Sequence, residues 1–176
     1  LGEEKERLQI EVNVMGVLNG IHAVLPDMLR RKQGQIVNVA SLAGRIPAPY
    51  AAVYTGTKFA IAGMTEALRH EFGEDIHFCI VYPSMVQTDL VAGISPPKFP
   101  SPIQAEDVAR AIVNAVEKQN ARAHVPKLGS FLALMPQLLP DILIRAISRW
   151  TGLSTMFVDI DDKARAIYRS RVVGEK

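Results

Sequence analysis

The chain has 176 residues but a single cysteine, Cys79, which lies inside an apolar run. One thiol cannot close an internal disulfide and offers no zinc-type spacing, so neither feature can hold this fold together. We interpret Cys79 as a small core residue in a protein of a reducing compartment. No metal site is expected, because no metal-ligand spacing such as His-x3-His links the four histidines, His22, His70, His77 and His124.

An excess of charge of one sign is also missing. The 20 basic and 18 acidic residues are interspersed and give a formal net charge of +2. Because no basic stripe is present, a nucleic-acid partner is not expected. The first residues, LGEEKERLQIEVN, mix acidic and basic side chains and lack the basic-then-apolar order of a secretory signal. Together with the lone thiol, these features predict a cytoplasmic protein.

A long, uninterrupted hydrophobic run is lacking in the most apolar segment, Leu128–Trp150. This segment is interrupted by Pro136, Pro140, Asp141 and Arg145. It falls short of the roughly 20 consecutive apolar residues that cross a bilayer. We therefore expect no transmembrane span.

What is present, 48% hydrophobic and 22% charged residues, is typical of a globular domain that buries a core. Apolar residues that recur every three or four positions predict helices at Glu3–Arg31, Ala51–Phe72 and Ile103–Gln119. Short apolar, β-branched runs predict strands at Gln35–Ser41 and His77–Ser84, and the run AHVP offers a brief third strand. This alternation indicates an α/β fold with a parallel sheet whose strands are buried on both faces.

The stretch SLAGRIPAPYAAVYTGTKFA places a hydroxyl, a phenol and an ammonium close together. Tyr54 and Lys58 are four residues apart at the start of a predicted helix, so their side chains share one face. A neighbouring ammonium stabilises a phenolate, so we expect Lys58 to lower the pKa of Tyr54 toward the range of an acid/base catalyst. Ser41 ends a strand at the sheet edge where α/β folds bind ligands. Its hydroxyl could hydrogen-bond an oxygen that Tyr54 protonates, so the three groups could act on one carbonyl.

These residues belong to a wider pattern. The runs VNVAS, YTGTK and PSMVQT, with the asparagine of VNVMG, resemble the classical short-chain dehydrogenase/reductase family over Glu3–Pro126. The resemblance implies a doubly wound parallel sheet, the Rossmann fold, and a catalytic set made of Asn13, Ser41, Tyr54 and Lys58. In that set Tyr54 is the general acid/base and Ser41 polarises the substrate carbonyl. Lys58 lowers the pKa of Tyr54 and holds the nicotinamide ribose, and Asn13 supports a water-mediated proton relay to Lys58.

The same resemblance implies cofactor contacts after the second strand, in addition to those of Tyr54 and Lys58. They fall on the run that matches P-G-x-V-x-T of the family, at Pro83, Ser84, Val86 and Thr88. Ser84 stands where the family usually has glycine. A side chain there would crowd a close backbone approach, unless its φ angle is negative.

The front of the family pattern is absent from this chain. The glycine-rich turn T-G-x-x-x-G-x-G and the run N-N-A-G do not occur in it. We interpret residues 1–127 as the C-terminal part of a Rossmann domain that is incomplete at its N-terminal side. The choice between NAD and NADP stays open, because the residues that decide it are missing. We expect this chain alone to be inactive and to bind a dinucleotide weakly.

The function that the resemblance implies is that of an NAD(P)-dependent oxidoreductase. It would interconvert a carbonyl and a secondary alcohol by hydride transfer, on a hydrophobic small molecule. The alternatives are a non-catalytic binding or scaffold protein, a truncated inactive fragment, and an epimerase or dehydratase that shares Tyr-x3-Lys. The long helices resemble those that pair across subunits, so a homodimer or homotetramer is expected.

Residues 128–176 are interpreted as an apolar helical extension, a lid or an interface, followed by a charged, solvated tail from Asp161. The second half of Leu128–Trp150 places one set of apolar side chains on a broad helix face: Ile142, Leu143, Ala146, Ile147 and Trp150. This face could cover a substrate pocket, pack between subunits or rest on a lipid surface.

Overall fold

Three parallel strands form the sheet of the computed structural model, which describes residues 2–158 and 161. β1 (Gln35–Val39) pairs with β2 (His77–Pro83), and β2 pairs with β3 (Arg122–Val125), in the order β1-β2-β3. The three predicted strands and their parallel arrangement are confirmed. Apart from Asp161, the tail predicted for residues 161–176 lies outside the described residues.

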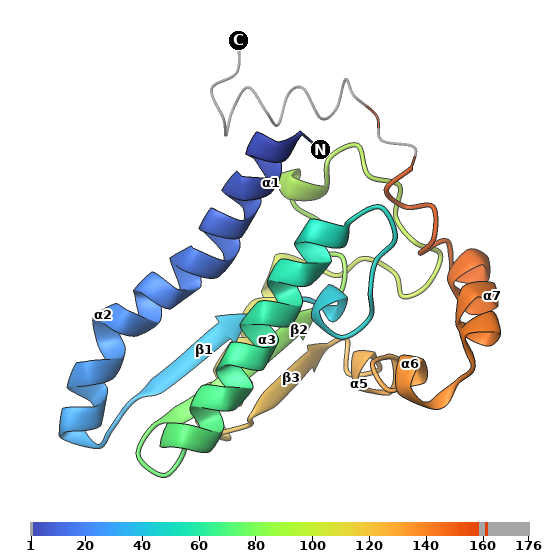
Figure 1. Cartoon of the computed structure of the whole chain (residues 1–176). Helices are drawn as coiled ribbons and strands as arrows, with labels where there is room; N and C mark the ends of the chain where they lie inside the picture. The colour runs from blue at the N-terminus through green and yellow to red at the C-terminus, as the bar shows by residue number, and fades with distance from the viewer. Residues whose placement is uncertain (1, 159–160, 162–176) are drawn as a thin grey trace.

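Helices cover both faces of this sheet (Figure 1). α2 (Gly16–Arg31) and α3 (Ala52–Phe72) pack on one face, and α4 (Ala105–Glu117) packs on the other. Successive residues of β2 alternate between the two faces and are almost fully buried: Phe78, Cys79, Ile80, Val81 and Tyr82. The arrangement is the doubly wound, Rossmann-like α/β fold that the sequence predicts.

β1 is less buried than predicted. Ile36 and Asn38 are buried beneath α2 and α3, whereas Gln35 is exposed and Val39 keeps 41% of its surface exposed. Within the described chain α4 packs chiefly on β2 and β3, so the second face of β1 has little cover. The prediction of burial on both faces is therefore right for β2 and wrong for β1. β1 also ends at Val39, two residues before its predicted end.

The helix predicted at Glu3–Arg31 contains a π-helical turn. α1 (Glu3–Ile10) leads into this turn, η1 (Glu11–Met15), and α2 then continues through Pro26. A π turn holds one residue more than an α turn, and such turns are frequent at functional sites. α2 stops at its predicted end because Lys32 adopts a left-handed conformation with φ 51°.

Two polar contacts hold α3 on the sheet. The side-chain amide of Asn38 donates to Thr65 Oγ1 at 2.9 Å in the buried layer between β1 and α3. Glu66 accepts hydrogen bonds from Arg69 and from Arg122, so it ties α3 to β3. Burial alone would raise the pKa of Glu66, but the hydrogen bonds from Arg122 and Arg69 outweigh it and hold the pKa below its ordinary value. α3 is thereby fixed over the strands.

Beyond β3 the chain forms three further helices, α5 (Gly129–Leu132), α6 (Met135–Leu138) and α7 (Asp141–Thr151). They lie to one side of the sheet, on the side of β3 and away from α2 (Figure 1). The prolines that interrupt the apolar run stand where helices begin, since Pro136 is in the first turn of α6 and Pro140 caps α7.

By length and composition alone, the helical segment Glu3–Arg31 is long and apolar enough to cross a membrane. The expectation that the chain has no span considered only Leu128–Trp150 and did not weigh this helix. Core helices of soluble proteins share this length and composition. In the described structure only 6% of the most apolar 18-residue stretch of this helix is buried. Most of that stretch is therefore open to a partner.

Candidate active site

Ser41 lies at the carboxyl end of β1. Strand pairing continues one residue past β1, because the Ala40 N–H donates to the Val81 carbonyl at 2.9 Å. Ser41 then begins the short turn η2 (Leu42–Gly44), and its Oγ accepts a hydrogen bond from the Ala43 N–H at 3.1 Å. This cap fixes the hydroxyl at the sheet edge where α/β folds bind ligands.

Tyr54 and Lys58 share one face at the N-terminal end of α3, as predicted from their spacing. Lys58 Nζ lies 5.7 Å from the centroid of the Tyr54 ring and donates to the Val39 carbonyl at 3.4 Å. The side chain of Ser41 lies near enough to the Tyr54 phenol to lower its pKa against the effect of burial. The structure therefore brings Ser41, Tyr54 and Lys58 into one cluster over the end of β1.

Burial controls the protonation of this cluster. It raises the pKa of Tyr54, and the hydrogen bond from Ser41 opposes that rise only in part. Burial also lowers the pKa of Lys58. The prediction that Lys58 lowers the pKa of Tyr54 is therefore wrong for this structure: the ammonium lies over the ring and donates to Val39, and the opposing effect comes from Ser41. Tyr54 accordingly keeps its proton through neutral pH.

The turn η2 packs closely on the backbone of α3. A Cβ placed on Gly44 would come within 2.7 Å of the Lys58 carbonyl oxygen, closer than real Cβ atoms approach. Glycine at this position lets the end of β1 approach α3 beside Lys58. Sequence reasoning missed Gly44, although it follows Ser41 by three residues in the run SLAG.

Asn13 lies in the π turn η1 and reaches α3 one residue before Lys58. Its side-chain amide donates to Thr57 Oγ1 at 3.1 Å, and the Thr57 hydroxyl donates to the Tyr54 carbonyl at 2.7 Å. Thr57 is buried, and sequence reasoning did not single it out. The π turn is thereby joined to the helical turn that carries both Tyr54 and Lys58.

Ser84 follows Pro83, the last residue of β2, and its N–H donates to the Val125 carbonyl at 2.8 Å. Among the described non-glycine residues, those with positive φ do not include Ser84, so this position does not require glycine. The Oγ of Ser84 is buried and has no hydrogen-bond partner in the described part of the chain. An unpartnered buried hydroxyl is costly and suits a site that a polar ligand completes.

Val86 and Thr88 continue this edge of the sheet. Val86 forms a parallel bridge with Ile103, and Thr88 caps the short turn η3 (Asp89–Val91) with extended backbone. The four expected cofactor contacts other than Tyr54 and Lys58 thus lie in one run that begins at the carboxyl end of β2.

Two observations concern the rest of the described molecule. A hollow of about 380 Å³ lies between the loop residues Lys98 and Phe99 and the end of α7 at Trp150 and Thr151, and none of the catalytic candidates lines it. No group of three or more potential metal ligands occurs within residues 2–158 and 161.

Comparison with known proteins defines the class of this chain. The sequence profile of the short chain dehydrogenase family matches residues 2–98, which is more than half of the chain. The chain therefore belongs to the short-chain dehydrogenase/reductase family.

Individual relatives share this stretch. An uncharacterised oxidoreductase of Staphylococcus saprophyticus is 41% identical over 120 residues, which cover 62% of this chain and 49% of the relative. The 3-ketodihydrosphingosine reductase of Bacteroides thetaiotaomicron is 34% identical over 135 residues, 73% of this chain and 49% of the relative. A short chain dehydrogenase of Burkholderia cenocepacia, crystallised in complex with NADP, is 26% identical in sequence and superposes with a TM-score of 0.70. The match covers 81% of this chain and 58% of that protein. This chain thus spans about half the length of the curated relatives it matches.

Proposed function

We propose that the protein carrying this chain is a nicotinamide-dependent reductase that converts a carbonyl into a secondary alcohol, with Tyr54 as the proton donor. The observation that carries the proposal is the cluster of Ser41, Tyr54 and Lys58 over the end of β1, where Lys58 Nζ lies 5.7 Å from the centroid of the Tyr54 ring and Ser41 acts on the pKa of the Tyr54 phenol. Membership of the short-chain dehydrogenase/reductase family supports it.

The protonation state of Tyr54 favours reduction. Because burial raises its pKa, the phenol is protonated at neutral pH and can donate to the oxygen of a carbonyl that is being reduced. Ser41 would donate a second hydrogen bond to that oxygen and stabilise the charge that develops there. A bound nicotinamide would supply the hydride.

Asn13 would act on this cluster through α3. Its hydrogen bond to Thr57 holds the helical turn between Tyr54 and Lys58. We propose that a water beside Asn13 returns a proton to Lys58, as the family resemblance implies. Asn13 is therefore a positioning and relay residue in this proposal.

The residues after β2 fit the nicotinamide end of the cofactor. The unpartnered Oγ of Ser84 and the backbone of the run through Val86 to Thr88 offer hydrogen-bonding groups for a carboxamide. Lys58 Nζ, held by one long contact to Val39, would hold the ribose hydroxyls. A glycine-rich turn for the pyrophosphate does not occur in residues 1–176, so tight binding is proposed for a protein of the relatives' full length. NAD and NADP are equally compatible with this half-site.

The proposed substrate is hydrophobic. One relative is named for the reduction of 3-ketodihydrosphingosine, a ketone. This name favours an apolar carbonyl compound over a small polar one.

We also propose a homodimer or homotetramer formed through the helices α1, η1, α2 and α3. These helices expose six large apolar side chains in the described structure, namely Leu8, Ile10, Val12, Met15, Val24 and Phe59. A self-complementary contact between two copies would bury them. It would also account for the apolar helix that, by composition alone, could cross a membrane.

The test is NADH and NADPH oxidation with a panel of hydrophobic ketones, in a protein of the relatives' full length. We expect Tyr54→Phe to lower kcat by about a hundredfold or more with near-normal cofactor binding, the usual scale for a lost acid/base group. The matched control is Tyr50→Phe, because Tyr50 is 75% exposed and only four residues away, and it should keep its turnover.

Cofactor titration by calorimetry distinguishes the alternatives. Residues 1–176 alone should bind either dinucleotide weakly and show no turnover. Retained turnover in Tyr54→Phe would remove Tyr54 from the mechanism. A full-length protein that binds neither dinucleotide would instead favour a scaffold role.

A further inference from the structure

We propose that the C-terminal helices dock on an anionic lipid surface through α7. The proposal rests on a set of exposed side chains on one face of this helix. We call this set the apolar stripe: Ile142, Leu143, Ala146 and Trp150. Ile142, Ala146 and Trp150 follow one another at intervals of one helical turn, and Leu143 lies beside them. Ile142 is 75% exposed and Trp150 is 74% exposed, so the stripe faces away from the fold.

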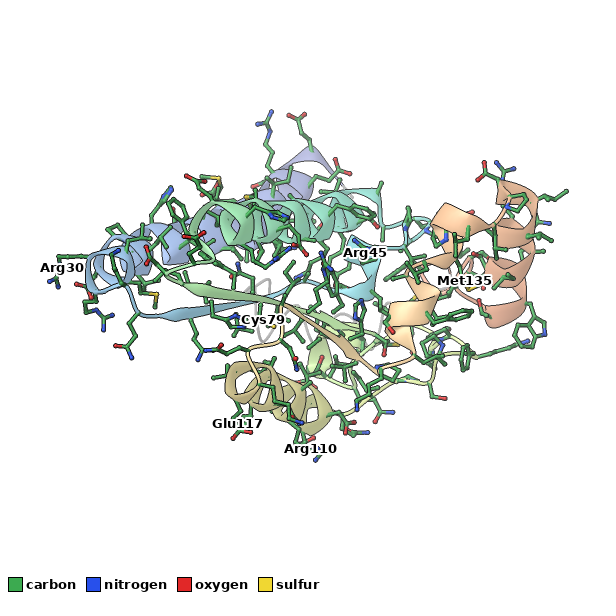
Figure 2. All side chains as sticks on the ribbon, turned by 90° about the horizontal axis from the view of Figure 1, so that it is seen from below. Arg30, Arg45, Cys79, Arg110, Glu117 and Met135 are labelled. Carbon is green, nitrogen blue, oxygen red and sulfur yellow. The ribbon has the colours of Figure 1, made fainter. Side chains whose placement is uncertain are left out.

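The opposite face of α7 is the one that packs inward. Thr151 is buried, and its hydroxyl donates to the Ile147 carbonyl at 2.8 Å. Its carbonyl accepts from the Lys98 N–H at 2.8 Å, which anchors the end of α7 on the loop. Figure 2 shows the helices around Met135 at the end of the molecule opposite Arg30, with side chains directed away from the sheet. The apolar stripe is therefore not the face that joins α7 to its own chain.

The neighbouring helices extend the apolar surface. Exposed large hydrophobic residues continue through the segment that precedes α7, at Leu128, Phe131, Leu134 and Leu138. Exposed apolar side chains that gather in one segment are more typical of an interaction site than single ones scattered over the surface. A bilayer, which accepts many apolar side chains at once, suits such a surface.

Basic side chains border the stripe. Arg145 and Arg149 are exposed, four residues apart on the row next to Ile142 and Ala146, and neither has an ion-pair partner among the described residues. Residues 127–151 contain three basic side chains, Lys127, Arg145 and Arg149, and one acidic side chain, Asp141. The formal net charge of this segment is therefore +2. Each basic residue near an anionic leaflet adds to binding, so charge and apolar area act together.

Charge and exposure also argue against two other roles for this face, namely a contact with a second copy of the chain and a lid over the chain's own substrate. A two-fold contact through this face would place the same patch on both copies, so Arg145 and Arg149 would meet like charges. A lid over the chain's own substrate would turn the stripe inward, whereas Ile142 and Trp150 point outward. Indole rings such as that of Trp150 favour the interface between headgroups and acyl chains. This inference does not rest on the proposed reductase activity.

The test uses Trp150 as the reporter, since it is the only tryptophan of the chain. The 176-residue chain is mixed with vesicles of phosphatidylcholine alone or with phosphatidylserine added. We expect co-sedimentation, a blue shift of the emission and quenching by brominated acyl chains with the anionic vesicles. Phosphatidylcholine vesicles, or high salt, should weaken binding by at least about tenfold.

Paired variants separate this face from the rest of the surface. Arg145→Glu with Arg149→Glu should weaken binding by at least about tenfold. The same charge change on α4 and its C-cap, Arg110→Glu with Lys118→Glu, should weaken it far less. Ile142→Asn should also weaken binding several-fold. Its control is Leu8→Asn on α1, which removes an apolar side chain that is 54% exposed.

Three results would overturn the proposal. The first is an emission unchanged by anionic vesicles. The second is a blue shift that appears without lipid as protein concentration rises, which would assign the stripe to a second copy. The third is an equal loss of binding in Leu8→Asn and Ile142→Asn, which would move the contact to the N-terminal helix or to the surface as a whole.

Discussion

Gly44 lies against the main chain of Lys58, so that a Cβ on Gly44 would come within 2.7 Å of the Lys58 carbonyl oxygen and 3.0 Å of its carbonyl carbon. Both atoms belong to the backbone of α3, so no flexible side chain can move aside to make room. Glycine, whose side chain is a single hydrogen atom, therefore allows the turn after Ser41 to lie this close to the helix that carries Tyr54.

Gly44→Ala should destabilise the protein by about 1–3 kcal/mol, because the added methyl forces η2 away from α3. The change is measured as the free energy of unfolding in urea. Gly63→Ala is the matched control, since a Cβ on Gly63 meets nothing within 4 Å and alanine raises helix propensity by up to about 1 kcal/mol. Equal stability of the two variants would contradict the close approach.

Ser41→Ala should raise the pKa of Tyr54 further. The hydrogen bond from Ser41 favours the phenolate, so its loss leaves the effect of burial unopposed and shifts ionisation to higher pH. The readout is the ultraviolet absorbance of tyrosinate during alkaline titration, with Tyr54→Phe identifying the signal of this residue. Ser130→Ala, which removes a surface hydroxyl, should leave the titration unchanged. A Tyr54 midpoint that falls, or stays the same, in Ser41→Ala would argue against the hydrogen bond.

Glu66→Gln should lower stability at neutral pH by about 1 kcal/mol, because the ion pairs with Arg122 and Arg69 are lost. The pKa of Glu66 is below its ordinary value in the fold, so its contribution is present above the unfolded pKa of about 4.5 and is lost as pH falls through the folded value. The stability difference between wild type and variant should therefore shrink in acid. Urea unfolding at a series of pH values measures it, with the exposed Glu71→Gln as control. A difference that stays constant into strong acid would refute this role.

Cys79 should be inert toward thiol reagents in the native protein. It is fully buried in β2, and burial raises the pKa of its thiol to about 11, so the reactive thiolate is both scarce and inaccessible. Reaction with a disulfide reagent at pH 8 should be slow in buffer and complete in strong denaturant. Rapid reaction without denaturant would show that β2 opens far more readily than its burial implies.

The sequence predicts the parts of this site that depend on local geometry. Tyr54 and Lys58 share a face because helical spacing fixes it, and the strands were recognisable from their apolar, β-branched runs. The pKa of Tyr54 could not be predicted, because it depends on how deeply the phenol is buried and on its contact with Ser41. Both follow from packing between distant segments.

The same limit explains the role of Thr57 and the position of the π turn. Helix propensities differ too little to locate one extra residue within Glu3–Arg31. The turn is instead joined to α3 by the hydrogen bond from Asn13 to Thr57, across 44 residues of sequence. The incomplete burial of β1 was missed because apolar composition does not reveal which neighbours a strand has.

The π turn also restricts where this chain can change in length. A π turn holds one residue more than an α turn, so removing one residue from η1 would leave a regular α-helix with α1 and α2 still in phase. Because each α-helical residue turns the chain by about 100°, removing a second residue would rotate α1 by about that angle relative to α2. α1 packs on α3, and the rotation would turn a different face of α1 toward it. Natural length changes beyond that one residue should therefore avoid Glu11–Met15 and collect in irregular segments such as residues 95–102.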